Sequence, residues 1–311
     1  MTGTAFQAAY LLVVAVLAPP LLARARWPVR APRLAIGLWL GLIASALTVL
    51  VLLGFGLACT AVHTLVRECC VRWIAHPSSG SPTLLLTGAG IAIAVVVPLR
   101  VGTVLLRNHL RWRRRQQNHV AAVDLLGRRV GLRDTSAVAI EHACPAAYCV
   151  AAHGGRIVLT TAALKMLSPA ELAAVVEHER AHLRGCHHII TCFTVSVARA
   201  LPHVPLFSAA ERAVARLVEM AADDAAARRV RADVLARGLA RLAAGRVENA
   251  VVTAAGALHA SGGDIAERIN RLLDSGSGAC TRSAYGAGAC WMLGLLVTPP
   301  AVFAATASFW C

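Results

Sequence analysis

The stretch Ser168-Pro-Ala-Glu-Leu-Ala-Ala-Val-Val-Glu-His-Glu-Arg-Ala-His182 decides how this chain folds. Ser168 is a favourable N-cap, proline suits the first helical position, and Glu171 completes a capping box. Gly185 marks the predicted end of the same helix. The stretch therefore predicts a helix over 168–185 that carries the pattern H-E-x-x-H.

His178 and His182 are about one helical turn apart, so their side chains project from the same face. Two neutral imidazoles at this spacing can bind one Zn²⁺, and Glu179 beside them can accept a proton from water. A solvated, charge-rich helix can match this short pattern by chance. The capping box, the apolar run from Leu172 to Val176 and a downstream acidic residue argue against chance.

The composition is too apolar for an ordinary soluble protein. Hydrophobic residues make up 57% of the 311 residues, so membrane segments are expected. The formal charge of +15 comes almost entirely from arginine, because Lys165 is the only lysine. We attribute this skew to coding bias in a GC-rich bacterial genome, and predict no direct nucleic-acid binding.

Four apolar segments are long enough to be transmembrane helices, at about 5–23, 34–58, 82–106 and 283–310. Arginine clusters follow the first and the third of them, and the positive-inside rule places both clusters in the cytoplasm. Both chain ends are then outside. The predicted architecture is three spans over 1–106, a polar cytoplasmic domain over 107–282 and a fourth span. We interpret Arg111 to Arg115 as a stop signal that also contacts anionic lipid.

The polar domain mixes short strands with helices. Strands are predicted at 137–140, 148–152 and 156–161, with a turn at Gly154-Gly155. Strand 156–161 comes shortly before the H-E-x-x-H helix, and its edge can pair with an extended peptide through backbone hydrogen bonds. Further helices are predicted at 120–129, 189–201, 208–229, 233–246 and 264–273, and a short loop is predicted at 63–80.

A catalytic zinc site needs a third protein ligand, and the sequence offers two. His188 fits the extended pattern H-E-x-x-H-x-x-G-x-x-H, whereas Glu219 lies on a separate predicted helix. The extended pattern needs a methionine-containing turn, but Met220 lies inside a helical run. Asp223 is one turn after Glu219 and can accept the second ring N–H of a ligand histidine. These points favour Glu219, with Asp223 behind a histidine.

The motifs resemble those of the gluzincin membrane peptidases. They are the Glu171 to His182 helix, the preceding Gly-Gly-Arg-Ile-Val-Leu-Thr, the later Glu-x-x-x-Asp and Arg268-Ile-Asn-Arg-Leu-Leu. The order of three spans, polar domain and fourth span is similar to that of the BlaR/MecR antirepressor peptidases. This resemblance implies a mainly α membrane protein whose inserted α+β, zincin-like metallopeptidase domain cleaves a cytoplasmic, BlaI/MecI-like repressor. It also implies Zn²⁺ on His178, His182 and Glu219, with Glu179 as general base.

Peptide hydrolysis also requires a donor to the tetrahedral oxyanion, for which Arg268 and His259 are the two candidates. No spacing argument separates them. His142, His153 and His187 are predicted to be ordinary polar residues rather than catalytic ones.

The chain differs from BlaR/MecR sensors after the fourth span. Those sensors carry an extracellular penicillin-binding domain there, whereas this chain ends at Cys311, so we expect a short form without that sensor. Two other functions stay open. One is a membrane quality-control protease of the HtpX type, and the other is a non-hydrolytic signalling scaffold. An intact Glu179 argues against the scaffold, because a structural metal site needs no general base.

Overall fold

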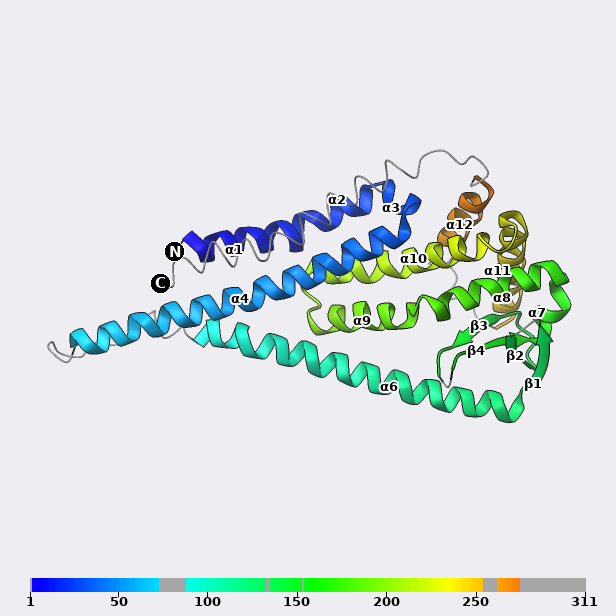
Figure 1. Cartoon of the computed structure of the whole chain (residues 1–311), viewed down its shortest axis with the longest axis horizontal. Coiled ribbons are helices and arrows are strands. Elements are labelled where there is room, and N and C mark those ends of the chain that lie inside the picture. The colour runs from blue at the N-terminus through cyan, green and yellow to red at the C-terminus, as the bar shows by residue number, and fades with distance from the viewer. Residues whose placement is uncertain (1, 73–87, 133–134, 153, 254–261, 275–311) are drawn as a thin grey trace. The chain divides into compact units, whose positions relative to one another are not determined.

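The computed structural model describes residues 2–72, 88–132, 135–152, 154–253 and 262–274 (Figure 1). It divides into two compact units. The first comprises residues 1–107, 193–213 and 282–311, and the second comprises residues 108–192 and 214–281. The predicted fourth span, 283–310, lies outside the described residues, as does His259.

The first unit is built from apolar helices. They are α1 (Thr2–Leu12), the π-helical η1 (Val13–Leu17), α2 (Ala18–Arg24), α3 (Trp27–Arg30), α4 (Pro32–Arg72), η2 (Ala92–Val96) and the start of α6 (Val97–Leu126). Three helical stretches are long and apolar enough to cross a membrane, namely Thr4–Arg24, Pro32–Cys59 and Gly88–Leu126. They overlap the three spans predicted in this part of the chain.

Helix α4 shows how these helices pack. Its buried residues Ala35, Trp39, Leu42, Ala46 and Val49 recur every three or four positions and form one continuous face. Helix α1 packs against α4, where the hydroxyl groups of Tyr10 and Ser45 form a hydrogen bond. Large apolar side chains on the other faces are exposed, as expected for helices surrounded by lipid, and they include Phe6, Leu12, Leu17, Leu21 and Phe55.

The loop predicted at 63–80 is wrong in its first part, because α4 continues as a helix to Arg72. No glycine or proline occurs between Gly56 and Pro77, so nothing in the local sequence ends the helix earlier. The charged residues that suggested a loop, Arg67 and Glu68, are good helix formers.

The second unit contains a four-stranded sheet of β1 (Arg128–Leu132), β2 (Thr135–Ile140), β3 (Ala147–Val150) and β4 (Arg156–Thr160). The strand order is β1-β2-β4-β3, with β2 and β4 parallel and the other neighbours antiparallel. The turn predicted at Gly154-Gly155 is confirmed, and both glycines have positive φ. Strand β1 was not predicted, because the helix expected over 120–129 ends at Leu126.

The open edge of the sheet is not the predicted one. Strand β4, expected to offer its edge, lies between β2 and β3, so both of its sides are already paired. Among the described strands, β1 and β3 are the two edges, and β3 is the one next to β4. Strand order depends on pairing between distant segments, which local patterns do not report.

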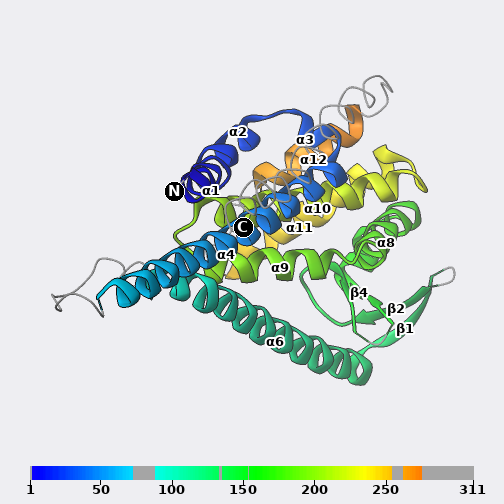
Figure 2. The same ribbon diagram turned by 60° about the vertical axis from the view of Figure 1, so that its left-hand side comes forward.

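The two faces of the sheet are covered by different helices (Figures 1 and 2). On one face, Val138 and Val158 pack with Val120 and Val123 from the C-terminal half of α6. On the other face, a core joins the sheet to α7 (Thr161–Met166), α8 (Pro169–Arg184) and α11 (Ala232–Thr253), and it contains Ala137, Ile157, Leu159, Ala163, Val175, Val176 and Leu242. Side chains alternate between the faces, so β3 presents Ala147 and Cys149 towards α8.

Three further helices complete the described chain, namely α9 (His187–Ala200), α10 (Pro205–Ala227) and α12 (Gly262–Asp274). Helix α12 packs on α11, and Leu272 joins a small core with Ala174 of α8 and Leu235 of α11. Helices α8, α10 and α12 are thereby held near one another.

The predicted capping box of α8 is confirmed. The Ser168 hydroxyl accepts from the Glu171 N–H, and the Glu171 carboxylate accepts from the Ser168 backbone N–H at 2.9 Å. We expect Ser168→Ala to destabilise the domain by about 1 kcal/mol, because a helix N–H loses its partner. Thermal unfolding in detergent measures this. Ser208→Ala is the matched control, and an equal shift in both variants would contradict the capping role.

Candidate metal centre

Three side chains converge on one point in the second unit. His178 and His182 come from α8, and Glu219 comes from α10. One donor atom from each lies within 4.8 Å of the others. The two Nε2 atoms are 3.1 Å apart, and the Glu219 carboxylate oxygens lie 3.6 Å from His178 Nε2 and 3.4 Å from His182 Nε2.

These separations fit a tetrahedral zinc ion. Zn²⁺ binds nitrogen and oxygen at about 2.0–2.2 Å, so neighbouring donors of a tetrahedron are about 3.3–3.6 Å apart. The 3.1 Å between the two Nε2 atoms agrees with this within a few tenths of an ångström. Each Nε2 atom also has a Glu219 oxygen close by, Oε1 at 3.4 Å from His182 and Oε2 at 3.6 Å from His178. Two imidazoles and one carboxylate are also a donor set typical of catalytic zinc, which leaves a fourth position free.

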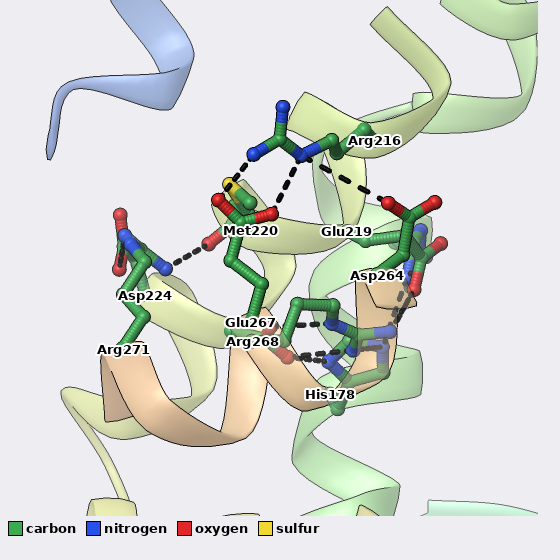
Figure 3. A network of polar contacts seen from close by, with 11 residues as sticks. His178, Arg216, Glu219, Met220, Asp224, Asp264, Glu267, Arg268 and Arg271 are labelled. Carbon is green, nitrogen blue, oxygen red and sulfur yellow. Dashed lines mark hydrogen bonds and ion pairs between the residues drawn. The ribbon is translucent and has the colours of Figure 1, made fainter. Parts of the chain in front are cut away.

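Arg268 lies next to His178 and Glu219 (Figure 3), and Asp223 contacts both His178 and Arg268. His178 Nδ1 lies 3.0 Å from Asp223 Oδ1, in ion-pair range, although its N–H is poorly aligned for a hydrogen bond. Arg268, from α12, donates to both Asp223 oxygens at 2.7 and 2.8 Å, and its Nη1 lies 2.9 Å from a Glu219 oxygen. The side chains of Asp223 and Arg268 are buried, so this pairing holds both carboxylates in place.

The electrostatics of the centre follow from this arrangement. Burial by itself lowers the pKa of His178, but contacts with Asp223 and Glu219 outweigh it and raise the pKa to about 9. Burial lowers the pKa of His182 to about 4. With their Nε2 atoms 3.1 Å apart, the two imidazoles are not both positively charged, and His178 holds the extra proton because it faces Asp223. A metal has to displace that proton, so binding should tighten as the pH rises.

Glu179 lies beside the donors and contacts β3. Burial raises the pKa of its carboxyl group, which moves a general base towards neutral pH. Its side-chain partner is the thiol of Cys149, whose pKa is raised to about 12 by burial and by Glu179 itself. The thiol therefore stays protonated and donates to the carboxylate. Sequence reasoning missed this role, although period-two alternation along β3 already placed Cys149 on the α8 face.

His187 is a second residue whose position was missed. Its Nδ1 lies 3.0 Å from His182 Nδ1, so it contacts the ring nitrogen that faces away from the donor cluster. The chain turns sharply after α8, with Cys186 at a φ of 48°, and the His187 ring packs over Gly185. A Cβ at position 185 would lie 2.4 Å from that ring, so this glycine makes room for it.

The remaining predicted residues are placed as follows. His188 stacks on Trp112 with ring centroids 4.9 Å apart and is not one of the three clustered donors. The structure thus brings Glu219, rather than His188, to the two histidines. Arg268 contacts Asp223 and Glu219, so its proposed oxyanion role stays a prediction that would require a change of partner.

Fold and site together define a metallopeptidase joined to helices that are apolar enough to cross a membrane. Its family is Peptidase family M48, whose model matches residues 109–275, just over half of the chain, and the chain belongs to this family. Peptidases of this family depend on a metal ion, typically zinc. Searches of curated proteins and of solved structures found no match.

Zinc content tests the choice of the third ligand. Glu219→Ala should weaken zinc binding by more than the roughly 10–100-fold that loss of an outer partner costs, because a direct donor is lost. His188→Ala should bind zinc like the wild type, because His188 stacks on Trp112. Competition with a zinc-sensitive dye measures both affinities. Normal binding by Glu219→Ala together with loss in His188→Ala would reverse the assignment.

Proposed function

We propose that this chain is a membrane-bound, zinc-dependent endopeptidase in which His178, His182 and Glu219 hold the metal and Glu179 is the general base. The observation that carries the proposal is the convergence of these donors at tetrahedral spacing. Membership of Peptidase family M48 supports the same chemistry. A non-hydrolytic scaffold would have no use for the partly buried Glu179 carboxyl group beside the donors.

Different residues of the chain have different roles in the proposed peptide hydrolysis. Bound zinc would polarise the scissile carbonyl group and lower the pKa of water towards about 7. Glu179 accepts a proton from the attacking water and delivers it to the leaving amine. The Cys149 thiol keeps that carboxylate oriented, and Asp223 with Arg268 fixes the donors.

The substrate is proposed to bind as an extended segment along β3. This strand is one of the two edges of the sheet that the described residues form, so its outer backbone groups can pair with a peptide of any sequence. Its Cys149 side chain contacts Glu179, which places the paired peptide next to the general base. Through this contact, a scissile peptide bond held along β3 would lie next to the general base of the metal centre.

We further propose that the peptidase domain faces the cytoplasm and cleaves a BlaI/MecI-like repressor. Two features support this reading, namely the arginine clusters that follow the first and third apolar segments and the similarity in span order to BlaR/MecR peptidases. A second candidate is quality control of membrane proteins, as in HtpX-type proteases. The family match covers the peptidase domain, on which this candidate also rests.

Purified protein in detergent tests the enzyme and separates the two substrates. A chelator should abolish cleavage, and added zinc should restore it. Cleavage of a repressor encoded beside the gene, with casein left intact, would support the regulatory role. Broad cleavage of casein and of an unfolded membrane protein would support quality control. Absence of zinc-dependent cleavage of all three substrates would overturn the endopeptidase proposal.

A further inference from the structure

A cavity of about 260 Å³ adjoins the candidate metal centre within the second unit. His182 and Glu219 form part of its wall, so its contents lie next to the reacting bond. Cys149 and Ala151, two positions apart along the chain at β3, form another part. Water occupies about 30 Å³ per molecule in the liquid, so this volume is far larger than one water requires.

Gln116 supplies the unexplained polar group of this cavity. It lines the cavity, and its Oε1 atom is buried without a hydrogen-bond partner among the described residues. Buried acceptors are almost always paired, so an unpaired one beside a cavity indicates a missing donor. Gln116 is held in place because the next turns of α6 pack on the sheet through Val120 and Val123.

The other walls indicate which donor would fit. Ala151, Ala215 and Val218 are apolar, and the Glu219 carboxylate already lies 2.9 Å from the Arg268 guanidinium. Thr191, His187 and His188 add polar side chains to the lining. The apolar walls suit an uncharged stem rather than a charged group. A peptide paired with β3 would direct alternate side chains towards the α8 face, and Cys149 on that face also lines the cavity.

We propose that this cavity is a side-chain subsite of the peptidase, in which Gln116 accepts a hydrogen bond from an uncharged substrate side chain ending in N–H or O–H. Glutamine, tyrosine and tryptophan have this chemistry. The inference rests on the proposed endopeptidase function and adds a substrate preference to it. Gln116 is then a specificity-determining residue, because an analogue without the donor leaves its acceptor unpaired.

A mixed peptide library, with the cut bonds mapped by mass spectrometry, tests the preference. At one position beside the cut, the wild type should prefer glutamine to methionine and tyrosine to phenylalanine by roughly tenfold, the effect of one neutral hydrogen bond. Gln116→Leu should remove both preferences while still cleaving the methionine and phenylalanine peptides. Gln117→Leu is the matched control, because Gln117 is the adjacent glutamine and its side chain is exposed.

Peptide binding separates this inference from the enzyme proposal. In a Glu179→Gln background, glutamine and methionine peptides should differ in Kd by a similar factor, and Gln116→Leu should remove the difference. Unchanged preferences in Gln116→Leu would overturn the subsite, as would an equal loss with every peptide, which indicates a backbone contact. Gln116→Met, checked for normal zinc content and melting temperature, repeats the test if the leucine variant misfolds. Binding without any cleavage by the wild type would refute only the endopeptidase function.

Discussion

Glu179→Gln should abolish peptide cleavage and leave zinc content unchanged. Glutamine has the shape of glutamate but cannot accept a proton from water, and general-base catalysis contributes about 10²–10⁴-fold. The three donors do not include Glu179, so the metal should remain. The glutamine oxygen can still accept from the Cys149 thiol, which preserves local packing.

Initial rates with membranes or detergent-solubilised protein, together with elemental analysis for zinc, measure both halves of this expectation. Glu211→Gln is the matched control, because it makes the same chemical change on a different helix, α10. Equal cleavage by wild type and Glu179→Gln would remove Glu179 from the mechanism. Loss of zinc together with activity would show that the residue contributes to metal binding.

Asp223→Ala should be the most destabilising single change in the peptidase domain. Asp223 is fully buried between His178 and Arg268, so its loss leaves a buried guanidinium unpaired. Breaking a buried ion pair from one side costs about 3–5 kcal/mol. Zinc affinity should fall as well, by roughly 10–100-fold, because His178 loses the group that orients its ring.

Thermal unfolding of a small series isolates this buried pair. Arg268→Met should also destabilise the domain, and the double variant should lose less than the sum of the single changes, because the two residues share one interaction. Asp233→Ala, which removes an exposed partner of Arg231 and Arg237, should have a much smaller effect. Additive losses would contradict direct coupling between Asp223 and Arg268.

The same pair predicts how stability depends on pH. Burial by itself raises the pKa of Asp223, but hydrogen bonds from Arg268 and the close contact with His178 outweigh it and lower the pKa to about 2. A depressed pKa means that the contribution to stability is complete above the ordinary value of about 4 and is lost as the pH falls towards 2. Acid unfolding of Asp223→Ala should therefore depend less on pH in this window than that of the wild type.

Much of the candidate centre could be predicted because its signals are local. The capping box at Ser168 and the one-turn spacing of His178 and His182 follow from helix geometry alone. Glu219 required one comparison between helices, with Asp223 one turn later as supporting evidence. Within each helix, these inferences use residues that are only a few positions apart.

The features that could not be predicted depend on which elements contact one another in the folded domain. The order of β4 and β3 in the sheet follows from pairing across the domain, so the wrong strand was expected at the edge. The contact between Cys149 and Glu179 joins a strand to a helix thirty positions later. The place of His187 depends on a sharp turn at Cys186, a residue type that rarely adopts positive φ. Neither the composition nor the hydrophobic periodicity of the chain predicts such contacts between separate elements.

The position of Arg268 in the chain affects the order in which the centre is assembled. Arg268 lies on α12, ninety residues after His178, and among the described residues it is the last partner of Asp223 and Glu219 to leave the ribosome. Contacts across such a separation form late, because the intervening chain has to be made and folded first. A nascent chain that has reached only α10 holds all three donors but lacks the guanidinium that pairs with Glu219 and with the buried Asp223. Synthesis from the N-terminus thus delays a mature protease until nearly its whole domain exists.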